Sequence, residues 1–282
     1  MTDAALAEIR IGHSPDPDDA FLFYGLTQGK IPLPGLRIHH HLKGIEELNQ
    51  EAFAGKLEMT AISLHAYAYC ADRYLLLRTG ASVGENYGPV VVAPKGFRPD
   101  EFGGSVVGIP GELTTAALLL RLAVGAIPVR VLPFDQILPA VLKGEIQAGV
   151  IIHEGQITYA GQGLNKVLDL GEWWHGETGL PVPLGVNVVR RNMGESLLRT
   201  LALGLKESLN YAMAHRLEAL RYAKQFGRGL DDAQTDRFVG MYVNHWSVDC
   251  RPKAAEAMQD LLDRAAEAGI IPRRITVEFV EE

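Results

Sequence analysis

His153 has both the residue type and the sequence context for acid–base chemistry, because it directly follows a short apolar run. That run, residues 146–152, is too short for a helix and rich in β-branched residues, which is typical of a strand buried in a parallel sheet. Ligands of open α/β sheets gather at the carboxyl ends of such strands. An imidazole at that edge could act as a general base, and the alternative is a core histidine bonded to a neighbouring backbone group.

Two adjacent hydroxyls, those of Thr114 and Thr115, follow Gly111 in a loop that leads into a predicted helix over 114–124. The first N–H groups of a helix have no partner inside the helix, so this loop could hold a carboxylate. The alternative is that Thr114 serves only as the N-cap of the helix. Gly111 and the doubled threonine favour binding.

The turn of residues 14–19 contains three aspartates and precedes a predicted helix over 20–26. The last carboxylates of the turn can cap that helix. Because three aspartates repel an anion, Ser14 and Asp19 are better suited to capping or to a ligand that carries hydroxyl groups.

The sequence predicts neither a metal site nor an organic cofactor. On a strand, His39 and His41 share one face while His40 points away, and no carboxylate or cysteine lies nearby in the sequence to complete a site. Cys70 and Cys250 lie far apart, which fits small buried thiols. Glycine-rich nucleotide loops, serine-centred elbows and P-loops are absent from the sequence, so neither hydride nor phosphoryl transfer is supported.

Short apolar strands alternate with helices over the first 63 residues, ending in a strand over 59–63. Two further apolar strands, 88–93 and 185–190, enclose a segment with its own strand–helix pattern. We interpret these two as crossover strands between two α/β domains. The larger domain is expected to contain residues 1–92 and 188–282, with mostly helical structure after Ser196, and the inserted domain residues 93–187.

The candidate residues share a position in this scheme. Ser63, Thr114, Thr115, His153 and the turn that begins at Ser14 all lie where a strand gives way to a loop or a helix. We therefore expect them to converge on one cleft between the two domains.

The composition is that of a soluble globular protein of 282 residues, with 47% hydrophobic and 22% charged residues. A net charge of −7 without basic blocks excludes a nucleic-acid binder. No stretch approaches the roughly 18 consecutive apolar residues of a membrane span, and residues 1–10 lack the apolar core of a signal peptide. We therefore expect a cytoplasmic protein with neither membrane nor nucleic-acid partners.

Several motifs occur in one order along nearly the whole chain. They are Ser14-Pro15-x-Pro17-x-Asp19, Phe21-x-Phe23-Tyr24, Gly111-x-x-Thr114-Thr115, Ile151-Ile152-His153-Glu154, Glu172-Trp173-Trp174 and Thr178-Gly179-Leu180-Pro181-x-Pro183-Leu184-Gly185. With these motifs the chain resembles the 1,4-dihydroxy-6-naphthoate synthase family of the futalosine route to menaquinone. The resemblance implies the two-lobed fold of type II periplasmic solute-binding proteins, used in the cytoplasm as an enzyme. It also implies a carbon–carbon lyase that converts cyclic dehypoxanthinyl futalosine to 1,4-dihydroxy-6-naphthoate and dihydroxyacetone without a metal or an organic cofactor.

Carried over residue by residue, the resemblance makes His153 the proton acceptor and makes Ser63, Thr114 and Thr115 contacts to a small carboxylate substrate. Three alternatives stay open: a solute-binding receptor for a small aromatic carboxylate, a diverged paralogue, and the chorismate-dehydrating enzyme of the same pathway and fold. The absence of a signal peptide disfavours the receptor, and the motif between Ser14 and Tyr24 disfavours the dehydrating enzyme.

The chain departs from the family pattern at three positions. Asp16 and Asp18 stand where the family usually has cysteine and asparagine, and Ala61 stands where the family has a substrate-contacting lysine. These differences predict a substrate site about three charge units more negative, which would weaken binding of an anionic substrate.

Overall fold

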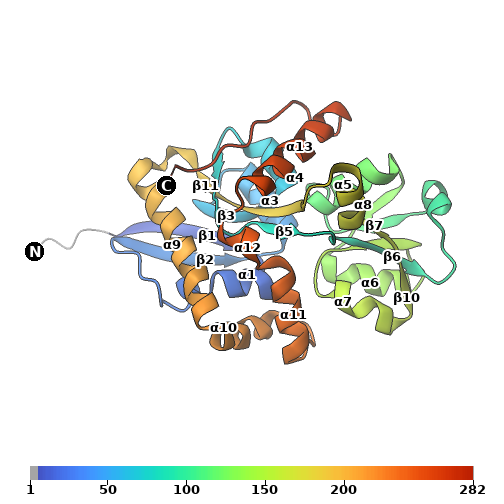
Figure 1. Ribbon diagram of the computed structural model, residues 1–282, viewed down its shortest axis with the longest axis horizontal. Helices are drawn as coiled ribbons and strands as arrows, with labels where there is room; N and C mark the ends of the chain where they lie inside the picture. The colour runs from blue at the N-terminus through green and yellow to red at the C-terminus, as the bar shows by residue number, and fades with distance from the viewer. Residues whose placement is uncertain (1–5, 282) are drawn as a thin grey trace, which may run out of the picture. The chain divides into compact units, whose positions relative to one another are not determined.

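The computed structural model describes residues 6–281, which form two compact α/β units (Figure 1). Unit 1 contains residues 6–82, 185–251 and 276–281, and unit 2 contains residues 83–184 and 252–275. This division differs from the expected one in the C-terminal region, where residues 252–275 group with unit 2. Within unit 2, Arg264 of helix α13 (Lys253–Glu267) lies over the Trp174 ring of helix α8 (Leu170–Thr178), 5.6 Å from the ring centroid.

The sheet of unit 1 contains parallel and antiparallel strands. Its members are β1 (Ala7–His13), β2 (Leu36–Leu42), β3 (Met59–Ser63), β4 (Tyr74–Leu76), β5 (Ser82–Gly84) and β11 (Val182–Arg190). The order is β2-β1-β3-β11-β4, with β5 paired to β11. β1 runs parallel to β2 and β3, and β11 runs antiparallel to β3 and β4. Every residue of β3 is buried, including the polar Thr60 and Ser63, as expected for a strand in the middle of a sheet.

Eight α-helices are described in unit 1. They are α1 (Pro17–Leu22), α2 (Tyr24–Thr27), α3 (Ile45–Phe53), α4 (Leu64–Cys70), α9 (Glu195–Ala214), α10 (Arg216–Ala223), α11 (Asp232–Tyr242) and α12 (His245–Val248). The short helices α1 and α2 pack against the long helix α9, and Phe21, Phe23, Leu205 and Leu209 are fully buried in the core there. Among residues 6–281, no helix combines the length and the apolar character needed to cross a membrane.

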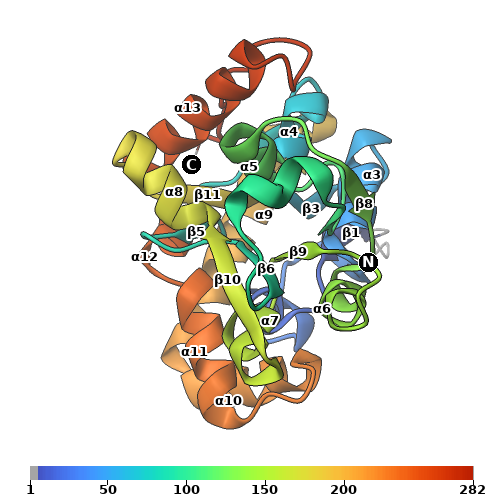
Figure 2. The same cartoon turned by 90° about the vertical axis from the view of Figure 1, so that its right-hand side faces the viewer.

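Unit 2 has a five-stranded sheet with helices on both faces (Figure 2). Its strands are β6 (Val90–Pro94), β7 (Val107–Ile109), β8 (Val129–Val131), β9 (Ala148–Ile151) and β10 (Leu164–Asp169), in the order β10-β6-β9-β7-β8. Helices α5 (Thr115–Val124) and α8 lie on one side of the sheet, and α6 (Phe134–Leu142) and α7 (Gly155–Thr158) lie on the other. Helix α6 approaches β9 so closely that a Cβ on Gly149 would lie 2.3 Å from Ile137.

The strands over 36–42 and 59–63 were predicted correctly. The crossover assignment differs for one strand: β11 spans a boundary between the units as expected, whereas β6 lies wholly in the sheet of unit 2 and β5 spans the other boundary. The first helix also begins earlier than predicted, at Pro17, because a proline suits the first helical position, where no N–H bond is needed.

Candidate active site

The His153 ring is held by backbone groups at the carboxyl end of β9. His153 follows the strand by two residues and is 6% exposed. Its Nε2 lies 2.8 Å from the carbonyl oxygen of Phe134, and its Nδ1 lies 3.1 Å from the backbone nitrogen of Gly155. A carbonyl can only accept and a backbone N–H can only donate, so the neutral ring carries its proton on Nε2. The ring therefore has the backbone bonds of a core histidine, and Nδ1 is its basic atom.

The structure brings the threonine pair to the same edge of the unit 2 sheet as His153. β7 and β9 are parallel neighbours, with Gly108 beside Gly149. The loop that leads from β7 to Thr114 and the segment that leads from β9 to His153 therefore leave the sheet at one edge. This is the edge at which α/β sheets bind ligands.

The hydroxyl protons of Thr114 and Thr115 point to backbone oxygens. Thr114 is the N-cap of α5: its Oγ1 accepts from the Ala117 nitrogen at 3.3 Å and donates to the Gly111 oxygen at 2.8 Å. The capping interpretation of Thr114 is thus confirmed. The Thr115 hydroxyl donates to the Leu184 oxygen at 2.6 Å. In this arrangement a carboxylate would take its hydrogen bonds from backbone N–H groups at the start of α5 and not from the two hydroxyls.

Ser63, at the carboxyl end of β3 in unit 1, is clamped by a residue that sequence reasoning missed. The Asn49 side chain accepts from the Ser63 backbone nitrogen at 2.8 Å and donates to the Ser63 hydroxyl oxygen at 3.2 Å. Both residues are buried. Because Asn49 occupies an acceptor position of the hydroxyl, the Ser63 proton is directed away from Asn49 and can be donated to a ligand.

The Ser14 turn lies beside Ser63 at the same edge of the unit 1 sheet. β1 and β3 are parallel, with Gly12 beside Thr60, so the residues after β1 emerge next to the end of β3. The Asp19 carboxylate accepts from the Ser14 backbone nitrogen at 2.7 Å and thereby closes the turn. Asp19 therefore has a role in shaping the turn. The convergence of these residues with the threonines and His153 stays a prediction.

The extra carboxylates of this turn add less negative charge than the sequence predicted. Asp16 forms an ion pair with Arg228, at 3.1 Å. Burial, and then the neighbouring Asp19 and Asp16, raise the pKa of Asp18 well above its usual range. Burial also raises the pKa of Asp19 to about 6, against the opposing effect of its hydrogen bonds to Ser14. The lysine position of the family is the buried Ala61 of β3.

Two histidines of β2, His39 and His40, each contact a side chain of β1. His40 Nδ1 lies 3.2 Å from Nε2 of His13, the last residue of β1, and the His13 ring stacks on Phe23 with 4.5 Å between ring centroids. Burial lowers the pKa of His13 to about 3 and that of His40 to about 4, so both rings are neutral at physiological pH. His39 pairs with Glu8. Within residues 6–281, no cluster of three or more His, Cys, Asp or Glu side chains could hold a metal ion.

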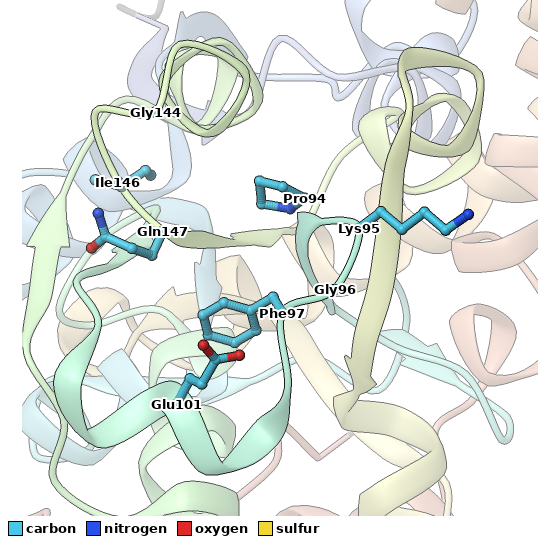
Figure 3. A pocket seen from close by; sticks show the side chains of 8 residues that line it. All are labelled: Pro94, Lys95, Gly96, Phe97, Glu101, Gly144, Ile146 and Gln147. Carbon is cyan, nitrogen blue, oxygen red and sulfur yellow. The ribbon is translucent and has the colours of Figure 1, made fainter.

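A separate pocket of about 300 Å³ lies at the other edge of the unit 2 sheet (Figure 3). It is lined by the end of β6, by the segment that follows β6 and by the residues before β9. The lining residues are Pro94, Lys95, Gly96, Phe97, Glu101, Gly144, Ile146 and Gln147. Since β6 and β9 are antiparallel, the end of β6 lies at the start of β9, away from His153. The pocket is therefore not part of the candidate site.

Comparisons with known proteins agree on one family. A family model described as menaquinone biosynthesis matches residues 9–267. The chain is 42% identical over 263 residues to a 1,4-dihydroxy-6-naphthoate synthase of Thermus thermophilus, which covers 93% of this chain and 95% of that protein. It is 34% identical over 271 residues to a protein of the same name from Streptomyces coelicolor, with 94% and 95% covered.

Solved structures show the same fold. Protein AF1704 from Archaeoglobus fulgidus superposes with a TM-score of 0.90 at 44% identity, covering 94% of this chain and 98% of that one. The alkanesulfonate-binding protein SsuA from Xanthomonas axonopodis pv. citri superposes with a TM-score of 0.71 at 17% identity, covering 97% of both chains. The second likeness shows a periplasmic-binding-protein-like fold. Together with the family match, these findings show that the chain belongs to the menaquinone biosynthesis family.

Proposed function

We propose that this protein is a 1,4-dihydroxy-6-naphthoate synthase, a carbon–carbon lyase that acts on cyclic dehypoxanthinyl futalosine in menaquinone biosynthesis. The names of the two relatives and the family match support the activity. The observation that supports the chemistry is the His153 ring, which is buried at the ligand-binding edge of the sheet and fixed in one tautomer by the Phe134 carbonyl.

In the proposed reaction, His153 removes a carbon-bound proton from the substrate as a general base. The electron pair left on the substrate drives cleavage of a carbon–carbon bond. Formation of an aromatic ring in 1,4-dihydroxy-6-naphthoate supplies the driving force, and the other product is dihydroxyacetone.

The substrate is proposed to be a small carboxylate, and each unit offers groups that suit such a ligand. In unit 2, the N-terminus of α5 offers backbone N–H groups and the favourable end of the helix dipole. In unit 1, the Ser63 hydroxyl can donate a hydrogen bond, and the turn between Ser14 and Asp19 suits a hydroxyl group of the ligand. We also propose that the protein acts in the cytoplasm, without a nucleic-acid or membrane partner.

The test is incubation of the purified protein with cyclic dehypoxanthinyl futalosine and detection of both products by mass spectrometry. Replacement of His153 by alanine is expected to lower turnover by roughly 10²–10⁴-fold while substrate binding persists, since a positioned base typically contributes that much. Full turnover by the His153→Ala variant would remove the base assignment.

A solute-binding receptor is the second candidate, because its fold is shared by SsuA. A receptor needs the same ligand contacts but no base. Binding of naphthoates without any turnover of the precursor would favour the receptor, and turnover of chorismate in its place would favour the dehydrating enzyme of the pathway.

A further inference from the structure

Two groups compete for one nitrogen of the His153 ring. The Gly155 N–H lies 3.1 Å from Nδ1, and the Glu154 carboxylate oxygen Oε2 lies 3.3 Å from the same atom. Nδ1 can accept from Gly155 only while it is unprotonated, and it can donate to Glu154 only once it is protonated. The two partners therefore correspond to the neutral and the charged ring.

The pair is buried, and apolar side chains lie against it. The side chains of His153 and Glu154 are 8% and 5% exposed. The Phe134 ring meets the imidazole edge-on at 5.1 Å, and Leu138 and Ile151 flank the backbone at Gly155. Opposite charges attract more strongly in such surroundings than in water, and an unpaired buried imidazolium would be costly.

We propose that Nδ1 is the atom that receives the substrate proton, and that Glu154 is the positioning residue that holds the resulting imidazolium as an ion pair. This inference rests on the proposed lyase function. The substrate C–H bond breaks, an Nδ1–H bond forms, and the electron pair passes to the substrate carbon. This pair forms a new bond within the ring as the carbon–carbon bond breaks, and the electrons of the broken bond leave with the three-carbon fragment. The ring then returns the proton to the leaving three-carbon fragment, and Nδ1 accepts from Gly155 again.

Glu154 is the charged group best placed for this role. β9 and α7, which flank the pair in the chain, contain no titratable side chain. Helix α6 contributes Asp135, which is exposed, and the turn after α7 contributes the half-buried phenol of Tyr159. Among the described residues of these elements, Glu154 alone places a buried carboxylate beside the ring.

The experiment compares Glu154→Gln and Glu154→Asp with wild type. Glutamine keeps the size of the side chain but not its charge, so kcat should fall about tenfold or more with KM nearly unchanged. The acid limb of the kcat/KM profile should move to lower pH, because the imidazolium is less stable without its partner. Aspartate should restore part of the rate. The control is Glu177→Gln, an exposed glutamate of α8, which should match wild type.

¹⁵N NMR of labelled histidine supplies a readout that does not depend on turnover, with His153 assigned from the spectrum of His153→Gln. The neutral wild-type ring should be protonated at Nε2, and at mildly acidic pH a smaller fraction of rings should be doubly protonated in Glu154→Gln than in wild type. A ring protonated at Nδ1, or equal fractions together with an unmoved acid limb, would overturn the inference. Absence of turnover in wild type would instead refute the proposed function, while the NMR comparison still decides the Glu154 pairing.

Discussion

Replacement of Asn49 by leucine should destabilise unit 1 and weaken substrate binding, because the Asn49 side chain makes two hydrogen bonds to Ser63. The substitution leaves the buried Ser63 N–H without its 2.8 Å acceptor and the Ser63 oxygen without its 3.2 Å donor. An unsatisfied buried donor costs about 1–3 kcal/mol, and a lost hydrogen bond about 0.5–1.5 kcal/mol. We expect a loss of roughly 2–4 kcal/mol in the free energy of unfolding, since leucine recovers a few tenths through helix propensity.

The assay is urea unfolding monitored by circular dichroism, together with measurement of KM for the proposed substrate. Asn210→Leu is the matched control, because Asn210 is an exposed asparagine inside helix α9 and should change stability by less than about 0.5 kcal/mol. Asn49→Asp separates the two roles: it keeps an acceptor for the Ser63 N–H but adds a carboxylate near Glu46, whose Oε2 lies 3.4 Å from the Asn49 nitrogen. If Asn49→Leu unfolds like the control and binds substrate normally, the clamp has no energetic role and the reasoning is refuted.

Two further variants test the geometry and the electrostatics of the site. Gly155→Ala should lower kcat more than it lowers stability, because the new Cβ would lie 3.0 Å from Cε1 of His153 and 2.7 Å from Leu138. Steady-state kinetics measures the change in kcat, and thermal unfolding measures the change in stability. Asp19→Asn tests the pH dependence of stability. In the folded state the pKa of Asp19 is about 6, above its ordinary value of 3.8. The Asp19 carboxyl group therefore contributes to stability below pH 3.8, and this contribution is lost as the pH rises through about 6. Asparagine keeps an acceptor for the Ser14 N–H and removes the titration, so the stability of the variant should decline less between those pH values, and an identical decline would contradict the assignment.

Local patterns in the sequence predicted the elements that carry the site. The short segment over 59–63 predicted the buried strand β3, and the hydroxyl before an apolar helix made the N-cap one of two interpretations of Thr114. The position of His153 after a short apolar strand was likewise visible, because strand and cap signals depend only on neighbours along the chain.

Contacts between distant segments were decided only by the tertiary structure. Asn49 reaches Ser63 across 14 positions, Phe134 binds His153 across 19, and Arg228 neutralises Asp16 across 212. The sequence determined which residue types stand at the ends of strands. The packing of helices on each sheet determined which side chains meet there. It thereby determined the tautomer of His153, the group that donates a hydrogen bond to the Ser63 oxygen, and the charge of the N-terminal turn. Each of these depends on atoms that only folding brings within hydrogen-bond distance.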